Sequence, residues 1–230
     1  MTRAMLSGDP PVEITLRRSA RARRVSLRVS GLDGRVTLSL PSGMATADAL
    51  AFAEEKSDWI RKHLSQQVGA VDVRLGGKIL FRGDELRIVP GAVRKAELGD
   101  STMQVPDRAD MAAARVKAFL KLSARVELTR VCAYYGQKLG RDVGKITLRD
   151  TRSRWGSCSS RGHLMFSWRL VMAPPKVLDY VAAHEVSHLV EMNHSDAYWA
   201  VVARICPEYA APRQWLRQNG QLLHRYRFGD

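Results

Sequence analysis

His184-Glu185-Val186-Ser187-His188 places two histidines four residues apart, with a carboxylate directly after the first. Another histidine, His194, follows a short distance downstream. Residues four apart lie one turn apart on the same face of an α-helix, so His184 and His188 are expected to point the same way. Two histidines at this spacing, an adjacent glutamate and a nearby third histidine form the donor set of a catalytic zinc site. Such a site has three protein ligands and leaves a fourth position for water.

The residues around this stretch predict an amphipathic helix over 175–192. Pro174-Pro175 suits a helix start, because a proline in the first turn gives up no hydrogen bond. On this helix Glu185 falls inside the apolar stripe. A carboxylate on a buried face is costly unless a cation or strong polar partners accompany it. A divalent metal ion would remove that cost and would give Glu185 the role of general base toward water.

The third ligand requires the helix to end. If the helix continued, His194 would point away from His184 and His188. We therefore expect a turn near 192–194, where Asn193 suits the left-handed conformation that ends helices. Ser195 can then cap a new helix, and His194 can return toward the metal.

The remaining pattern predicts an α+β protein. We expect a hairpin of strands 24–30 and 35–40 around the Asp33-Gly34 turn signal. The predicted helices are 46–67, 106–139, 175–192, 196–205 and 210–222, and strand character covers 12–40, 73–105, 144–150 and 163–170. These elements suggest a β-rich N-terminal region with one helix, residues 1–105, and an α+β region, residues 106–230. All of the recognisable chemistry falls in the second region.

Composition limits the class of protein. The chain has 230 residues and 45% hydrophobic composition, enough for a sizeable core. It has no apolar run long enough for a membrane span, and its first ten residues lack the apolar stretch of a signal peptide. Its three cysteines are far apart and odd in number. These features favour the reduced cytoplasm.

The chain is strongly basic, with a formal net charge of +14. The segment 17–28 contains six arginines and no acid. Such a surface attracts nucleic acid or other polyanions, but it can equally be a solvated strand face that keeps the protein soluble.

The wider motif resembles one family of zinc peptidases. The spacing of the three histidines matches that of metzincins, but Glu191 stands where metzincins carry glycine. The chain is more similar to the YgjP-like metallopeptidase family, which is akin to the SprT-like and WLM proteases. The residues that carry this resemblance are Arg154-Trp155-Gly156-Ser157-Cys158-Ser159, Gly162-His163-Leu164, Arg169-Leu170, Pro174, Tyr180-Val181, the histidine helix, Asn193-His194-Ser195 and Tyr198-Trp199. Tyr198 replaces the usual phenylalanine.

The resemblance implies a zincin-like fold and a zinc-dependent peptidase with one zinc ion. His184, His188 and His194 would be its ligands and Glu185 its general base. By analogy with zincins, the strand 163–169 would be an edge strand that pairs with an extended peptide or protein substrate. Arg154, His163 and Tyr198 are candidate substrate-binding residues, and Trp199 is expected to pack under the site.

A second hypothesis remains open at this point. The chain could be a nucleic-acid- or nucleoprotein-binding protein with a structural or vestigial zinc site, or a DNA-associated protease. Retention of Glu185 and the lack of an evident fourth ligand favour the enzyme, because structural zinc sites are usually closed by four protein ligands.

Overall fold

The computed structural model describes residues 2–31, 33–65 and 69–229. The chain divides into two compact units, residues 1–70 and 71–230. The first unit contains the strands β1 (Thr2–Leu6), β2 (Val12–Ser19), β3 (Ser26–Val29) and β4 (Val36–Pro41) and the helices α1 (Thr46–Glu55) and α2 (Ser57–Ser65). The strands form one sheet in the order β1-β2-β4-β3.

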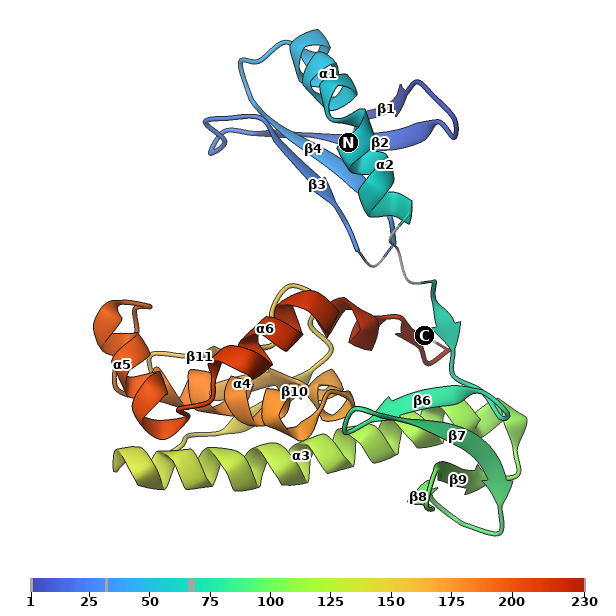
Figure 1. Cartoon of the computed structure of the whole chain (residues 1–230), viewed down its shortest axis with the longest axis vertical. Coiled ribbons are helices and arrows are strands. Elements are labelled where there is room, and N and C mark those ends of the chain that lie inside the picture. Colours follow the sequence, from blue (N-terminus) through green and yellow to red (C-terminus); the bar gives the residue numbers. More distant parts are fainter. Residues whose placement is uncertain (1, 32, 66–68, 230) are drawn as a thin grey trace. The chain divides into compact units, whose positions relative to one another are not determined.

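Alternating side chains give this sheet one apolar face. Ile14, Leu16, Val36, Leu38 and Leu40 are buried, and α1 and α2 cover them (Figure 1). The antiparallel pairing of β3 with β4 confirms the predicted hairpin. The predicted helix 46–67 is interrupted at Lys56, which caps the end of α1; its last two residues lie outside the described part of the chain.

The second unit begins much earlier than the boundary expected at 105–106. It contains β5 (Val71–Asp72), β6 (Lys78–Phe81), β7 (Asp84–Gly91), β8 (Glu97–Leu98) and β9 (Thr102–Pro106). β5 pairs with β13 (Tyr226–Arg227) near the end of the chain. Ile79, Ile88 and Val105 belong to the same buried core as the following long helix. The division therefore falls at residues 70 and 71, because these strands bury their apolar faces against C-terminal elements.

The long helix α3 (Ala112–Leu139) runs through the second unit (Figure 1). A short 3₁₀ turn, Ala109–Met111, precedes it. Its buried residues include Ala112, Val116, Leu120, Ala124 and Leu128, which follow one another at intervals of four and so form one stripe. Gly140 ends the helix in the left-handed conformation with φ 62°.

A three-stranded sheet and the histidine helix α4 (Pro175–Ser187) follow. The sheet consists of β10 (Ile146–Arg149), β11 (Gly156–Cys158) and β12 (Leu164–Ser167) in the order β10-β12-β11. β12 therefore lies in the centre, and the expectation that 163–169 is an edge strand is wrong. The polar segment 151–162 contains the additional strand β11, which takes the edge position.

The C-terminal part is helical. It comprises α5 (Asp196–Ile205) and α6 (Ala210–Asn219), with 3₁₀ turns at Trp168–Met172 before α4 and Gly220–His224 after α6. α4 packs against α3, α5, α6 and β11, so it lies inside the unit. Within the described residues, no helix is both long and apolar enough to cross a membrane. Cys132, Cys158 and Cys206 are free thiols.

Candidate metal centre

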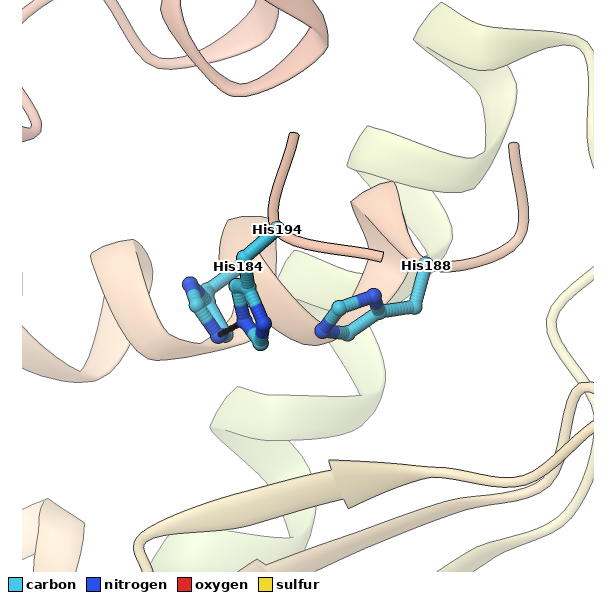
Figure 2. A group of neighbouring side chains, drawn as sticks. All are labelled: His184, His188 and His194. Carbon is cyan, nitrogen blue, oxygen red and sulfur yellow. Dashed lines mark hydrogen bonds between the residues drawn. The ribbon is translucent and has the colours of Figure 1, made fainter. Parts of the chain in front are cut away.

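The three histidines meet at one place. His184 lies in the last turn of α4, His188 caps the helix, and His194 lies on the segment that leads to α5. Figure 2 shows the ring of His194 beside that of His184, with the His188 ring pointing toward them. One ring nitrogen from each residue lies within 4.8 Å of the others. The three side chains can therefore hold a single metal ion.

The helix ends sooner than the sequence pattern suggests. α4 stops at Ser187, and residues 188–190 form turns instead of continuing to 192. Asn193 does not adopt the left-handed conformation, since Arg82 is the only non-glycine residue with positive φ among those described. The expected turn is nevertheless present, and the chain turns back so that His194 can reach the other two histidines. Ser195 caps α5 as predicted, and its hydroxyl accepts a hydrogen bond from the Tyr198 N–H at 3.3 Å.

One pair of ring nitrogens has the spacing that a tetrahedral zinc ion requires, and the third ring, of His188, is in the tautomer that suits a metal ligand. Zinc–nitrogen bonds of about 2.0–2.1 Å in a tetrahedron separate the ligand nitrogens by about 3.3 Å. His184 Nε2 and His194 Nε2 are 3.1 Å apart. His188 Nδ1 donates a hydrogen bond to the Glu191 carbonyl at 3.0 Å, which leaves its Nε2 lone pair for a metal. Buried His184 Nδ1 has no hydrogen-bond partner in the described part of the chain.

Burial keeps two of these rings neutral, as metal ligands must be. It lowers the pKa of His184 to about 4, assisted by His188, His194 and the positive charge of Arg213. Burial also lowers the pKa of His188.

Glu185 lies beside the histidine cluster in a dry environment. It is only 5% exposed, and burial raises the pKa of its carboxyl group to about 8, although the charge of Arg154 acts in the opposite direction. A cation held by the histidines would favour its ionised form. Its side chain packs on Gly156 of β11, where a β-carbon would come within 2.5 Å of Glu185 Cγ and Oε1. The carboxyl group therefore lies at the edge strand of the sheet.

Tyr198 does not have the substrate-binding position suggested for it. It is fully buried, and its ring lies 4.6 Å, centroid to centroid, from that of His188. Its hydroxyl donates to the main-chain carbonyl of His184 at 2.9 Å. That carbonyl belongs to the last turn of α4, where helical partners run out. Tyr198 thus supports the part of the chain that carries His184 and His188. Trp199 also packs against the cluster, with its ring centroid 6.0 Å from that of His184.

The other two candidate substrate residues differ in position. Arg154 is exposed, and its charge acts to lower the pKa of Glu185, so it stays a candidate substrate-binding residue. His163 is engaged elsewhere, because its Nδ1 accepts a hydrogen bond from the Lys145 N–H at 3.2 Å. His163 contributes to the connection between β11 and β12, and the metal cluster does not include it.

Sequence reasoning missed Arg213 on α6. Its guanidinium carbon lies 4.3 Å from the centroid of the Trp199 ring, and its charge contributes to the low pKa of His184. A lone arginine about twenty residues beyond His194 carries no motif, so only the packing of α6 against α4 reveals it.

A comparison with known families agrees with this geometry. A family model described as YgjP-like, metallopeptidase domain, matches residues 23–219. Neither the curated proteins nor the solved structures yield a match.

Proposed function

Because this chain belongs to the YgjP-like metallopeptidase family, we propose that it is a zinc-dependent peptidase with one zinc ion and Glu185 as its general base. His184, His188 and His194 would hold the ion. The observation that carries the proposal is the convergence of these three rings next to a buried carboxyl group that has no structural partner of its own among the described ion pairs.

The side chains of this protein would supply the metal ligands and the general base of the reaction. A zinc ion is a Lewis acid that lowers the pKa of water and polarises a carbonyl group. Glu185, one position after the first histidine, would accept a proton from the attacking water and deliver it to the leaving amine. The low pKa of His184 keeps its ring available as a ligand at neutral pH. Burial of Glu185 excludes bulk water from the proton transfer.

β11 gives an extended peptide a place to bind. Two hydrogen bonds join the ends of β11 to β12 and its flank. The Ser167 N–H donates to the Trp155 carbonyl at 2.8 Å, and the Ser159 N–H donates to the His163 carbonyl at 2.9 Å. Backbone groups alternate in an antiparallel ladder, so those of Gly156 and Cys158 face the free edge. A substrate strand added there would run next to Glu185.

The decisive experiment compares wild type with Glu185→Gln. Both proteins should retain zinc, measured as metal content after dialysis, because Glu185 is not a ligand. Only the wild type should cut a proteome-derived peptide library, with cleavage sites identified by mass spectrometry. Glu191→Gln is the matched control. Glu191 contributes to the site through its main-chain carbonyl, which the substitution keeps. Equal cleavage by wild type and Glu185→Gln would refute the proposal.

The first unit supports nucleic-acid binding as a second candidate function. The sheet face opposite α1 and α2 carries a cross-strand row formed by Arg3, Thr15, Thr37 and Arg28. Arg17, Ser39 and Ser26 form a parallel row. Arg3 pairs with Glu13, whereas Arg17 and Arg28 have no carboxylate partner in the described residues. Arginine interspersed with small hydroxyl side chains is suited to phosphate contacts.

This second candidate predicts salt-dependent binding of DNA by the full-length chain. Replacement of Arg17 and Arg28, or of Arg21, Arg23 and Arg24, by glutamine should weaken binding and flatten its dependence on salt. The double replacement of Arg94 and Arg204, exposed arginines of the second unit, is the control. A wild type that binds no DNA at low salt would exclude this function.

A further inference from the structure

Arg213 occupies an unusual position for a cation. It projects from α6 onto the ring of Trp199, 4.3 Å from guanidinium carbon to ring centroid. The same ring lies 6.0 Å from His184 and 6.1 Å from His194, between centroids. A guanidinium stacked on an aromatic face is held in place without losing its hydrogen-bond donors, which lie in its plane. Arg213 is therefore presented beside the histidine cluster, and no described residue accepts a hydrogen bond from its guanidinium group.

No carboxylate neutralises this charge within the part of the chain that the structure describes. Glu208, at the start of the same region, is paired with Lys176. The Trp199 ring that carries this guanidinium packs beside the rings of His184, His194 and Tyr198, so the positive charge lies close to the histidine cluster. Arg217, one turn further along the same face of α6, adds to the positive potential at Tyr180.

A fixed cation next to a metal site weakens the binding of the metal ion, because like charges repel. Arg154, in the segment that precedes β11, also directs its charge toward Glu185. β11 and α6 both pack against α4, so Arg154, just before β11, and Arg213, on α6, come from two different parts of the chain. Such an arrangement is favourable when the substrate itself brings a negative charge. Arginine binds carboxylates and phosphates through two parallel hydrogen bonds, which lysine cannot reproduce.

We propose that Arg213 binds an oxyanionic group of the substrate next to the histidine cluster, and thereby selects negatively charged substrates. This inference rests on the proposed hydrolase site but concerns what the site accepts. The group can be an acidic side chain, a C-terminal carboxylate or a phosphate. Each offers oxygen atoms in the geometry that a guanidinium recognises.

Binding measurements test whether Arg213 recognises an oxyanion, and they do not require the protein to cleave a substrate. The protein is Glu185→Gln, with and without zinc, and calorimetry records binding of three probes. These are a capped peptide with glutamate compared with its glutamine version, a peptide with a free carboxyl terminus compared with its amide, and inorganic phosphate. The added variants are Arg213→Gln, Arg213→Lys and, as the matched control, Arg204→Gln, which removes the same charge from the exposed surface of α5.

At least one anionic probe should bind more tightly than its neutral counterpart, and Arg213→Gln should weaken that binding about 10- to 100-fold. The affinity of Arg213→Lys for that probe should lie between those of the parent and of Arg213→Gln. Arg204→Gln should bind the probe as tightly as the parent. The probe that responds identifies the source of the anion. Equal binding of every probe to Arg213→Gln and Arg204→Gln would overturn the inference. Because the readout is binding, this result is separate from a failure to cleave peptides, which would contradict only the proposed peptidase activity.

Discussion

The α-carbon of Gly156 lies directly against the carboxyl group of Glu185. A β-carbon at position 156 would fall 2.5 Å from both Cγ and Oε1 of that side chain, closer than atoms can approach. The two residues come from different elements, the edge strand β11 and the helix α4. The missing side chain at 156 creates the space that the glutamate occupies, so the strand fixes where the carboxyl group can lie.

Gly156→Ala should therefore impair catalysis more than folding. The added methyl group forces the Glu185 carboxyl group out of its position, because Cγ and Cδ are crowded as well as the terminal oxygen. A displacement of about 1 Å can lower activity by roughly 100-fold. The variant should show this loss in kcat/KM while it retains its zinc content and a cooperative unfolding transition.

Gly43→Ala is the matched control for that substitution. A β-carbon at Gly43 meets no atom within 4 Å, so this change should leave activity unaltered. If Gly156→Ala cleaves as fast as Gly43→Ala, Glu185 does not act from the position seen here.

His194→Ala should lower zinc affinity by at least about 100-fold, because it removes one of three ligands. Competition with a zinc chelator gives the affinity directly. The same substitution should change the free energy of unfolding of the zinc-free protein little, since the His194 side chain is exposed. Stoichiometric zinc at wild-type affinity in this variant would show that His194 is not a ligand.

Tyr198→Phe should destabilise the zinc-free protein by about 1–3 kcal/mol. The substitution leaves the buried ring in place but removes the hydrogen bond to the His184 carbonyl. A buried carbonyl without its donor carries the cost of desolvation. Chemical denaturation measures the change, with Tyr134→Phe as the control because Tyr134 is exposed. Equal stabilities of the two variants would contradict the supporting role of Tyr198.

The histidine cluster was the part of the site most accessible to sequence reasoning. Helical spacing alone places His184 and His188 on one face, and the apolar stripe predicts that Glu185 is buried, which the structure confirms at 5% exposure. The requirement for a turn before His194 was also correct, although the helix ends at Ser187 and not near Met192. Local turns at 188–190 replace the left-handed residue that the pattern suggested.

Features that depend on distant partners could not be predicted in the same way. The strands 71–106 alternate like those of the first unit, and only their pairing and shared core assign them to the second. β11 has few apolar residues, so its edge position and the central position of β12 follow from strand order. Arg213 reaches the histidines through the packing of α6, which no spacing in the sequence encodes.

Arg169→Ala should destabilise the fold by about 3 kcal/mol or more. Arg169 is 8% exposed and binds Asp150 through two hydrogen bonds, of 2.6 and 3.1 Å. It also donates to the carbonyls of Leu223 and Tyr226, so it joins the sheet to the C-terminal segment. Removal leaves all these acceptors without their donor.

Arg130→Ala provides the comparison, because Arg130 forms an exposed ion pair with Glu127. Such surface pairs contribute about 0–1 kcal/mol. Denaturant titration of the two variants should separate them clearly, and similar losses in both would rule out a structural role for Arg169.

His224 makes the stability of the fold depend on pH. Its ring stacks on Trp155 at 4.8 Å between centroids. Burial lowers its pKa to about 4 from the ordinary value of 6.5, and the charge of Arg169 acts in the same direction. Between these values the unfolded chain takes up a proton that the folded protein does not. The free energy of unfolding should therefore fall as the pH falls from about 6.5 toward 4, with a contribution of up to about one proton from this residue.

His224→Phe keeps an aromatic ring against Trp155 but removes that proton. The stability of zinc-free His224→Phe should consequently decline less steeply than that of wild type between pH 6.5 and 4, and the two curves should run parallel above pH 7. His184 and His188 have lowered pKa values too, but they are present in both proteins and cancel in the comparison. Curves that stay parallel down to pH 4 would mean that His224 is protonated in the folded protein as readily as in the unfolded chain.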